Sequence, residues 1–125
     1  MPPYNIQDRT FEFSAGIVSF CRDLVSANPV TRRLGWQLLD SATSVGANME
    51  EADAGQSTPD FISKTAIARK EAKETVYWLR LISATDAGWR PKVLPLLKEA
   101  NEIASIVSTI NRNAEANAKR KKRYE

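Results

Sequence analysis

Apolar side chains recur along most of this 125-residue chain at alternating intervals of three and four residues. This is the period of an amphipathic α-helix that turns one face to a core. Turn-forming residues interrupt the pattern at Asn28-Pro29, at residues 53–57 and at residues 85–89. The pattern therefore predicts helices over about residues 8–27, 30–53 and 57–85, and a fourth from near Pro91 to beyond Ala114.

Four such helices joined by short connections are typical of an all-α, antiparallel up-down four-helix bundle. The expected core positions share the helical spacing in each segment. They are Phe13, Ile17, Phe20 and Leu24; Leu34, Leu38, Ala42, Val45 and Met49; Phe61, Thr65, Ala68, Ala72, Thr75, Leu79 and Ile82; and Val93, Leu97, Ala100, Ala104, Val107 and Ile110.

Several residues mark the predicted helix ends. Ser57 or Thr58 can cap the third helix, because a hydroxyl accepts from the free backbone N–H groups of the first turn. Gly55 suits the end of the second helix. Pro95 would break a helix interior, so the alternative to a start near Pro91 is a start near Pro95, with Val93 and Leu94 in a lead-in turn.

The composition excludes several kinds of active site. There is no histidine, which removes Ser-His-Asp and Cys-His catalysis and histidine metal sites. Cys21 is the only cysteine and lies in an apolar helical stretch, so we expect a buried, inert thiol and no disulfide. We expect no cofactor, no metal and no enzymatic activity.

The beginning of the sequence lacks the basic start and apolar run of a signal peptide, and no run approaches the ~20 apolar residues of a membrane span. We therefore expect a cytoplasmic protein with no membrane partner. We assign residues 1–117 to the bundle and residues 118–125 to a disordered basic tail.

Positive charge is concentrated at the end of the chain. Residues 112–125 contain six basic and two acidic residues, a net charge of +4, whereas residues 1–111 carry −1. Such a cluster can bind nucleic-acid phosphates without reading sequence, and a tyrosine beside it can stack on an unpaired base. The alternative is a solvated end that aids solubility. The candidate nucleic-acid-binding residues are Arg112, Lys119, Arg120, Lys121, Lys122, Arg123 and Tyr124.

The stretch "RKEAKETVYWLRL", residues 69–81, carries apolar residues outside the predicted core seam. A helix in a monomeric bundle needs only one apolar stripe, so a second stripe favours a contact with another subunit. One alternative is that the core-facing stripe is wide and Trp78 only covers its edge. The other is that Glu71 and Glu74 form a catalytic pair of carboxylates. We predict a subunit interface made of Ile67, Glu71, Glu74, Trp78 and Leu81. Three cations of this stretch would pair with the two glutamates, within or between subunits: Arg69, Lys70 and Lys73.

Two motifs resemble the 23S rRNA intervening-sequence (S23-type) protein family. The first is "QLLDSATSVGANMEEA", residues 37–52, and the second is "DFISKTAIARKEAKETVYWLRL", residues 60–81. The resemblance implies a four-helix bundle assembled as a homopentameric ring. It also implies a relation to the accessory protein of diversity-generating retroelements, a basic pentamer that binds nucleic acid and a reverse transcriptase.

The sequence departs from the family pattern at four positions. Leu39 and Asp40 stand where the family often has two arginines, Gly46 replaces a proline and Ala52 replaces a glycine. The missing arginines leave the C-terminal cations as the main candidates for contacts with phosphates. We expect structural roles for Asn48 and Glu51, which match the motif.

These observations lead to one functional prediction and one alternative. We predict a ring-shaped homo-oligomer, without enzymatic activity, that binds RNA or DNA through its basic surface and tail. The alternative is a protein–protein scaffold or accessory subunit with no affinity for nucleic acid.

Overall fold

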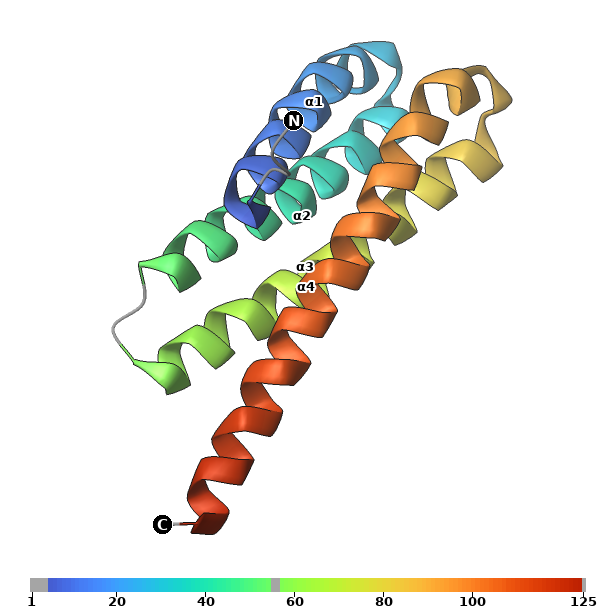
Figure 1. Ribbon diagram of the computed structural model, residues 1–125. Helices are drawn as coiled ribbons and strands as arrows, with labels where there is room; N and C mark the ends of the chain where they lie inside the picture. Colours follow the sequence, from blue (N-terminus) through green and yellow to red (C-terminus); the bar gives the residue numbers. More distant parts are fainter. Residues whose placement is uncertain (1–4, 55–56, 125) are drawn as a thin grey trace.

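The computed structural model describes residues 5–54 and 57–124, and it places nearly all of them in helices (Figure 1). Each long helix packs mainly against the next one along the chain, which confirms the predicted up-down bundle. The elements are α1 (Ile6–Ala27), α2 (Pro29–Asp53), α3 (Thr58–Thr85), the short 3-10 turn η1 (Ala87–Trp89) and α4 (Arg90–Tyr124).

Side-chain caps explain where three of the helices begin. The Asn5 side chain accepts a hydrogen bond from the backbone N–H of Asp8, and Asn28 does the same for Thr31. Ser57, one of the two predicted caps, accepts from the N–H of Asp60 at 3.2 Å. Each oxygen satisfies a donor that has no partner within its own helix. The predicted cap Gly55 lies outside the described residues.

The helices bury the faces that the spacing predicts. The core-facing residues of α1, most of those of α2, and six of the seven seam residues of α3 are buried, while Leu34 and Phe61 are half-buried. On α4 the buried seam also includes Ile103, which the prediction omits. The core is continuous through all four helices and includes Ile17, Leu38, Leu79 and Val107.

The predicted start of the last helix near Pro91 is confirmed, and the alternative start near Pro95 is wrong. α4 begins at Arg90, directly after η1, and Pro95 lies inside it. A proline at this position removes the hydrogen bond to the carbonyl of Pro91. Pro91 and Pro95 are both exposed, so water can solvate that carbonyl at the surface.

Two glycines bring α1 and α2 close together. A Cβ atom at Gly35 would lie 3.0 Å from Leu24 Cβ, and a Cβ atom at Gly46 would lie 3.0 Å from Ser14 Oγ. Both distances are shorter than ordinary van der Waals contact. The departure from the family pattern at Gly46 therefore coincides with close packing against α1.

The contact between α1 and α4 is lighter than the contacts between helices that follow one another in the chain, and it includes ion pairs as well as core residues. Arg9 Nε and Nη2 donate to the two carboxylate oxygens of Glu99 at 2.8 and 2.7 Å, and Nη2 also reaches Glu102. At the other end of α1, Lys92 pairs with Asp23 at 3.1 Å. These pairs hold α1 beside the first half of α4.

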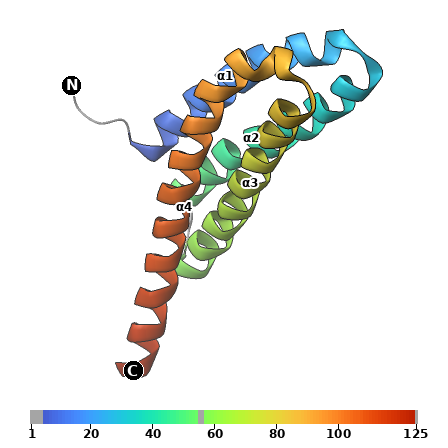
Figure 2. The same ribbon diagram turned by 90° about the vertical axis from the view of Figure 1, so that its right-hand side faces the viewer.

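The second half of α4 extends past the start of α3. In both views its red end projects beyond the connection between α2 and α3 (Figures 1 and 2). The sequence predicts an unstructured tail from residue 118, whereas α4 continues as a helix to Tyr124. Ala114, Ala116 and Ala118 favour helix, and cations at its C-terminus are stabilised by the helix dipole. Glu125 lies outside the described residues.

Among the helices of residues 5–54 and 57–124, none combines the length and the apolar character that a membrane crossing requires.

Candidate nucleic-acid interface and assembly face

The cations predicted to bind nucleic acid lie on the exposed end of α4. We call residues 112–124 the terminal segment. Its six basic residues are all exposed, and Tyr124 is 81% exposed. Within residues 5–54 and 57–124, the basic members of ion pairs are Arg9, Lys64 and Lys92. The charges of the terminal segment are therefore not neutralised by carboxylates of the described chain.

Asn111 anchors α4 immediately before the terminal segment. It is only 1% exposed, and its Nδ2 donates to the Ile62 carbonyl at 3.2 Å and to Thr65 Oγ1 at 3.0 Å. Its Oδ1 accepts from Arg69 Nη1 at 3.4 Å. Such a fully partnered buried amide fixes the register of two helices. The sequence analysis missed this residue, although Asn111 continues the seam of α4 four residues after Val107.

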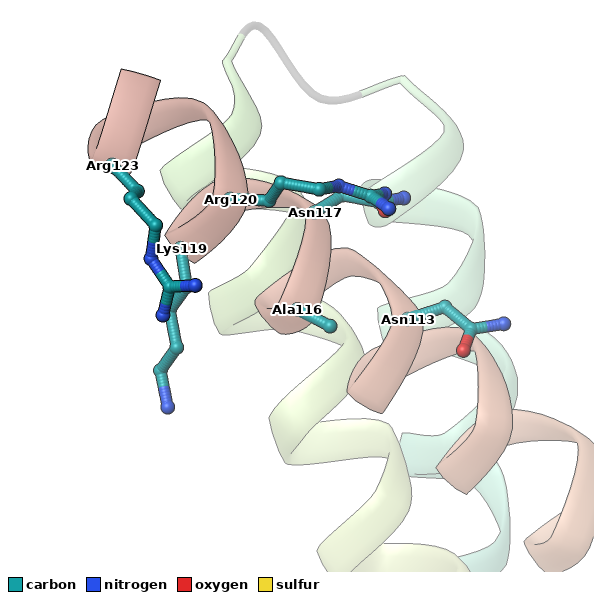
Figure 3. Close-up of a pocket in the computed structure, with 6 residues that line it drawn as sticks. All are labelled: Asn113, Ala116, Asn117, Lys119, Arg120 and Arg123. Carbon is teal, nitrogen blue, oxygen red and sulfur yellow. The ribbon is translucent and has the colours of Figure 1, made fainter. Parts of the chain in front are cut away.

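A hollow in the terminal segment is drawn in Figure 3 and is lined by residues of α4 alone. Lys119 and Arg123 point together to one side of the helix, whereas the Arg120 guanidinium lies against Asn117 and donates to its Oδ1. Among the described residues, no residue of another helix lines this hollow. A surface of this kind suits an extended polyanion better than a small molecule, which needs a concave site.

The predicted subunit-interface residues form a second surface, which we call the assembly face. Ile67 is 39% exposed, and Glu71, Glu74, Trp78 and Leu81 are half-buried. Trp78 Nε1 donates to Glu74 Oε1 at 3.2 Å, and the Trp78 ring packs against the core. The structure thus brings Glu74 and Trp78 together.

The glutamates of the assembly face belong to an acidic surface shared by α3 and α2. Burial raises the pKa of Glu71, and the nearby carboxylates of Glu74 and Asp40 raise it further, while Lys70 opposes the shift. In the described part of the chain, no three carboxylate or cysteine side chains are grouped so as to hold a metal ion. The predicted pairs of Arg69, Lys70 and Lys73 with these glutamates are not formed within the subunit.

Two exposed aromatic residues near this face were not predicted as interface residues. Tyr77 is 53% exposed and its ring meets Trp78 edge to face, with centroids 5.1 Å apart. Trp36 on α2 is 48% exposed. The hydrogen bond from Thr75 Oγ1 to Ser41 Oγ sets the register of these antiparallel helices and places Trp36 at about the level of Arg80. The period of one helix cannot reveal this register.

The comparisons with known proteins identify the family. The family model described as "23S rRNA-intervening sequence protein" matches residues 4–109. The chain belongs to this family. The matched region of this 23S rRNA-intervening sequence protein contains the bundle and the assembly face, but it ends before the terminal segment.

A solved structure supports the same conclusion. It is a protein of unknown function from the S23 ribosomal protein family of Bacteroides thetaiotaomicron VPI-5482, with a TM-score of 0.77 and 37% identity. The match covers 86% of this chain and 98% of the other. No curated protein matches the sequence.

The two residues that match the family motif at the end of α2 have structural contacts, as predicted. Asn48 Nδ2 donates to the carbonyl and the hydroxyl of Ser44, one turn earlier in the same helix. Glu51 pairs with Lys64 of α3 at 3.3 Å. These contacts account for both residues without a ligand.

Proposed function

We propose that this 23S rRNA-intervening sequence protein is a non-enzymatic homo-oligomer that binds RNA or DNA through the terminal segment. The family resemblance favours a pentameric ring. In such a ring, the assembly face packs against a neighbouring subunit, and each α4 presents its cations to the ligand. Several weak sites on one particle then bind one polymer with avidity.

The observation that carries the proposal is the exposed, unneutralised charge on the projecting end of α4. Five consecutive cations, residues 119–123, lie on helical turns that extend beyond α3. A helix presents these charges on a stiff support, so they lose less conformational entropy on binding than the charges of a flexible tail. Sequence-independent binding to phosphates with a strong salt dependence is the expected behaviour.

The test compares the protein with a variant in which residues 119–123 are all changed to glutamine. Glutamine keeps the helix propensity and removes the charge. Binding to a 20-base-pair DNA duplex and to an RNA duplex is measured from 50 to 200 mM salt, with the mass of the particle followed by light scattering. If five phosphates are contacted, affinity for DNA should fall by about 500-fold over this range.

The variant should lose roughly tenfold or more in affinity and show a smaller salt dependence while keeping the particle mass. An unchanged affinity would contradict the proposal, provided that circular dichroism shows the same helix content. A monomeric mass for the unmodified protein would contradict the role of the assembly face.

A protein–protein scaffold is the second candidate function. It is favoured by the exposed Tyr77 beside Trp78, since aromatic residues are enriched in interfaces. A stable oligomer that binds neither duplex at 50 mM salt would favour this candidate over the first.

A further inference from the structure

We infer that a double-stranded nucleic acid lies along the groove between α3 and α4, and that only one side of the terminal segment contacts it. This inference rests on the proposed function and specifies its binding surface. Six cations from two helices make up the surface, which we call the basic strip. They are Arg69, Lys70, Lys73, Arg112, Lys119 and Arg123.

The α3 half of the basic strip lines a groove. Arg69, Lys70 and Lys73 lie with Ala66 on the α3 wall, and Asn111 and Glu115 lie on the α4 wall. Lys70 and Lys73 are exposed, and Arg69 is half-buried.

These three cations are available to a ligand. The hydrogen bond to Asn111 Oδ1 holds the Arg69 guanidinium at the groove. Among the described residues, no carboxylate lies within 4.0 Å of Arg69, Lys70 or Lys73. Their charges are therefore not paired with a carboxylate of the described residues, and the groove that they line is open to an anionic ligand.

The α4 half of the basic strip follows from helical spacing. Arg112, Lys119 and Arg123 recur at intervals of seven and four, so they share one side of α4. Glu115, which faces the groove, is four residues before Lys119 and lies on this side too. Figure 3 shows Lys119 and Arg123 pointing the same way.

Arg120 and Lys121 have contacts on another side of α4. They line a hollow with Thr58, at the start of α3, although Arg120 also borders the hollow lined by Lys119 and Arg123. Figure 3 shows Arg120 beside Asn117, away from Lys119 and Arg123. Arg120 and Lys121 carry the same charge as Lys119 and Arg123 within the same two turns. They therefore serve as a matched control.

The length of the basic strip favours a duplex. The Asn111–Thr65 hydrogen bond places Lys73 at the level of Ile103, and the 20 residues from there to Arg123 span about 30 Å. This is close to one turn of a DNA duplex, about 34–36 Å. Single-strand sites stack bases on aromatic side chains, and none of the six residues of the strip is aromatic.

Glu115 is the one acidic residue that lines this groove. It lies among the six cations, where a bound phosphate backbone would pass, and its charge opposes that backbone. Removing the charge should therefore strengthen binding, whereas removing a cation of the strip should weaken it.

The experiment measures affinity of the full-length protein for the two duplexes, and for a single strand of equal charge, from 50 to 200 mM salt, and affinities are compared at 100 mM. Variants K70Q/K73Q and K119Q/R123Q should each lose roughly tenfold or more and lower the DNA salt slope by about 1.8. The control R120Q/K121Q should lose less than about threefold. E115Q should gain roughly two- to fivefold, as expected for one charge at the protein surface.

The outcomes separate this inference from the function on which it rests. Suppose that K70Q/K73Q binds like the unmodified protein, and that K119Q/R123Q and R120Q/K121Q weaken binding equally. The inference is then wrong and the proposed function stands. If the unmodified protein prefers the single strand, the duplex is the wrong ligand. If it binds none of the three probes at 50 mM salt, the proposed function fails as well.

Discussion

The two sides of α3 differ in charge although they come from the same few turns. Towards α2, the carboxylates of Glu71 and Glu74 lie near Asp40, with Trp78 beside them. Towards α4, Arg69 bonds to Asn111, and Lys70 and Lys73 line the groove. The sequence "RKEAKE" looks like a mixed, nearly neutral surface. Helical geometry places Glu71 and Glu74 towards α2 and Arg69 and Lys73 towards α4, with Lys70 at the boundary between the two charges.

Replacing Trp78 with alanine should have the largest effect on the α2 side. The ring packs against the core and its Nε1 bonds to Glu74, so we expect a loss of about 2–4 kcal/mol in the free energy of unfolding, together with loss of the oligomer. Urea denaturation at fixed protein concentration and light scattering measure the two effects. The more exposed Tyr77→Ala variant is the control and should cost less than about 1 kcal/mol. Equal costs would contradict the distinction between the two rings.

Replacing Asn111 with alanine should have the next largest effect, on the α4 side. The substitution removes the bonds to Ile62 and Thr65 and leaves Arg69 without its acceptor, so we expect a loss of about 2 kcal/mol. The corresponding change towards α2, Ser41→Ala, removes a single hydroxyl pair with Thr75 and should cost about 1 kcal/mol. Thermal unfolding of both variants compares the two sides directly. A larger cost for Ser41→Ala would overturn the role of Asn111 as the stronger anchor.

The smallest expected effect is the pH dependence due to Glu71. Its folded pKa lies above the ordinary 4.5 because of burial and the nearby carboxylates, so between these two values the folded state binds more protons than the unfolded state. Its contribution to stability therefore falls as pH rises through this window. Glu71→Gln should flatten the dependence and stabilise the fold slightly at pH 7. If stability falls more steeply over this window in Glu71→Gln than in the unmodified protein, the contribution of Glu71 has the opposite sign to the expected one.

Glu99 provides a contrast in the same measurement. Its hydrogen bond to Arg9 lowers its pKa, so its contribution is present above pH 4.5 and is lost as pH falls through the folded value. Glu99→Gln should therefore lower the free energy of unfolding at neutral pH and leave it nearly unchanged at strongly acid pH.

The sequence alone predicts the parts of this fold that depend on one helix at a time. The interruptions at Asn28-Pro29 and Ser57 place the helix starts within one or two residues for α2 and α3, and the three–four spacing identifies most of the core. The alternative start near Pro95 is wrong because proline is tolerated near a helix start, where the affected carbonyl faces water.

Features that depend on register between helices could not be predicted in this way. Trp36 lies at the level of Arg80 only because Ser41 meets Thr75, and Asn111 becomes an anchor only because it meets Thr65. The expected ion pairs of α3 are a further case. The spacing of Arg69, Lys70 and Lys73 allows pairs with Glu71 and Glu74, but none of these pairs comes within 4.0 Å, and Arg69 bonds to Asn111 of α4 instead.

The order of packing has a consequence for how the protein is made. Each helix packs mainly on its neighbour in sequence, and α1 meets α4 only lightly, so most native contacts join nearby parts of the chain. Chains of this kind fold quickly, and their N-terminal parts can fold while synthesis continues. α1, α2 and α3 can therefore pair before α4 has been synthesised, and the strongly basic stretch of α4 leaves the ribosome, a particle rich in RNA, after the other three helices have emerged.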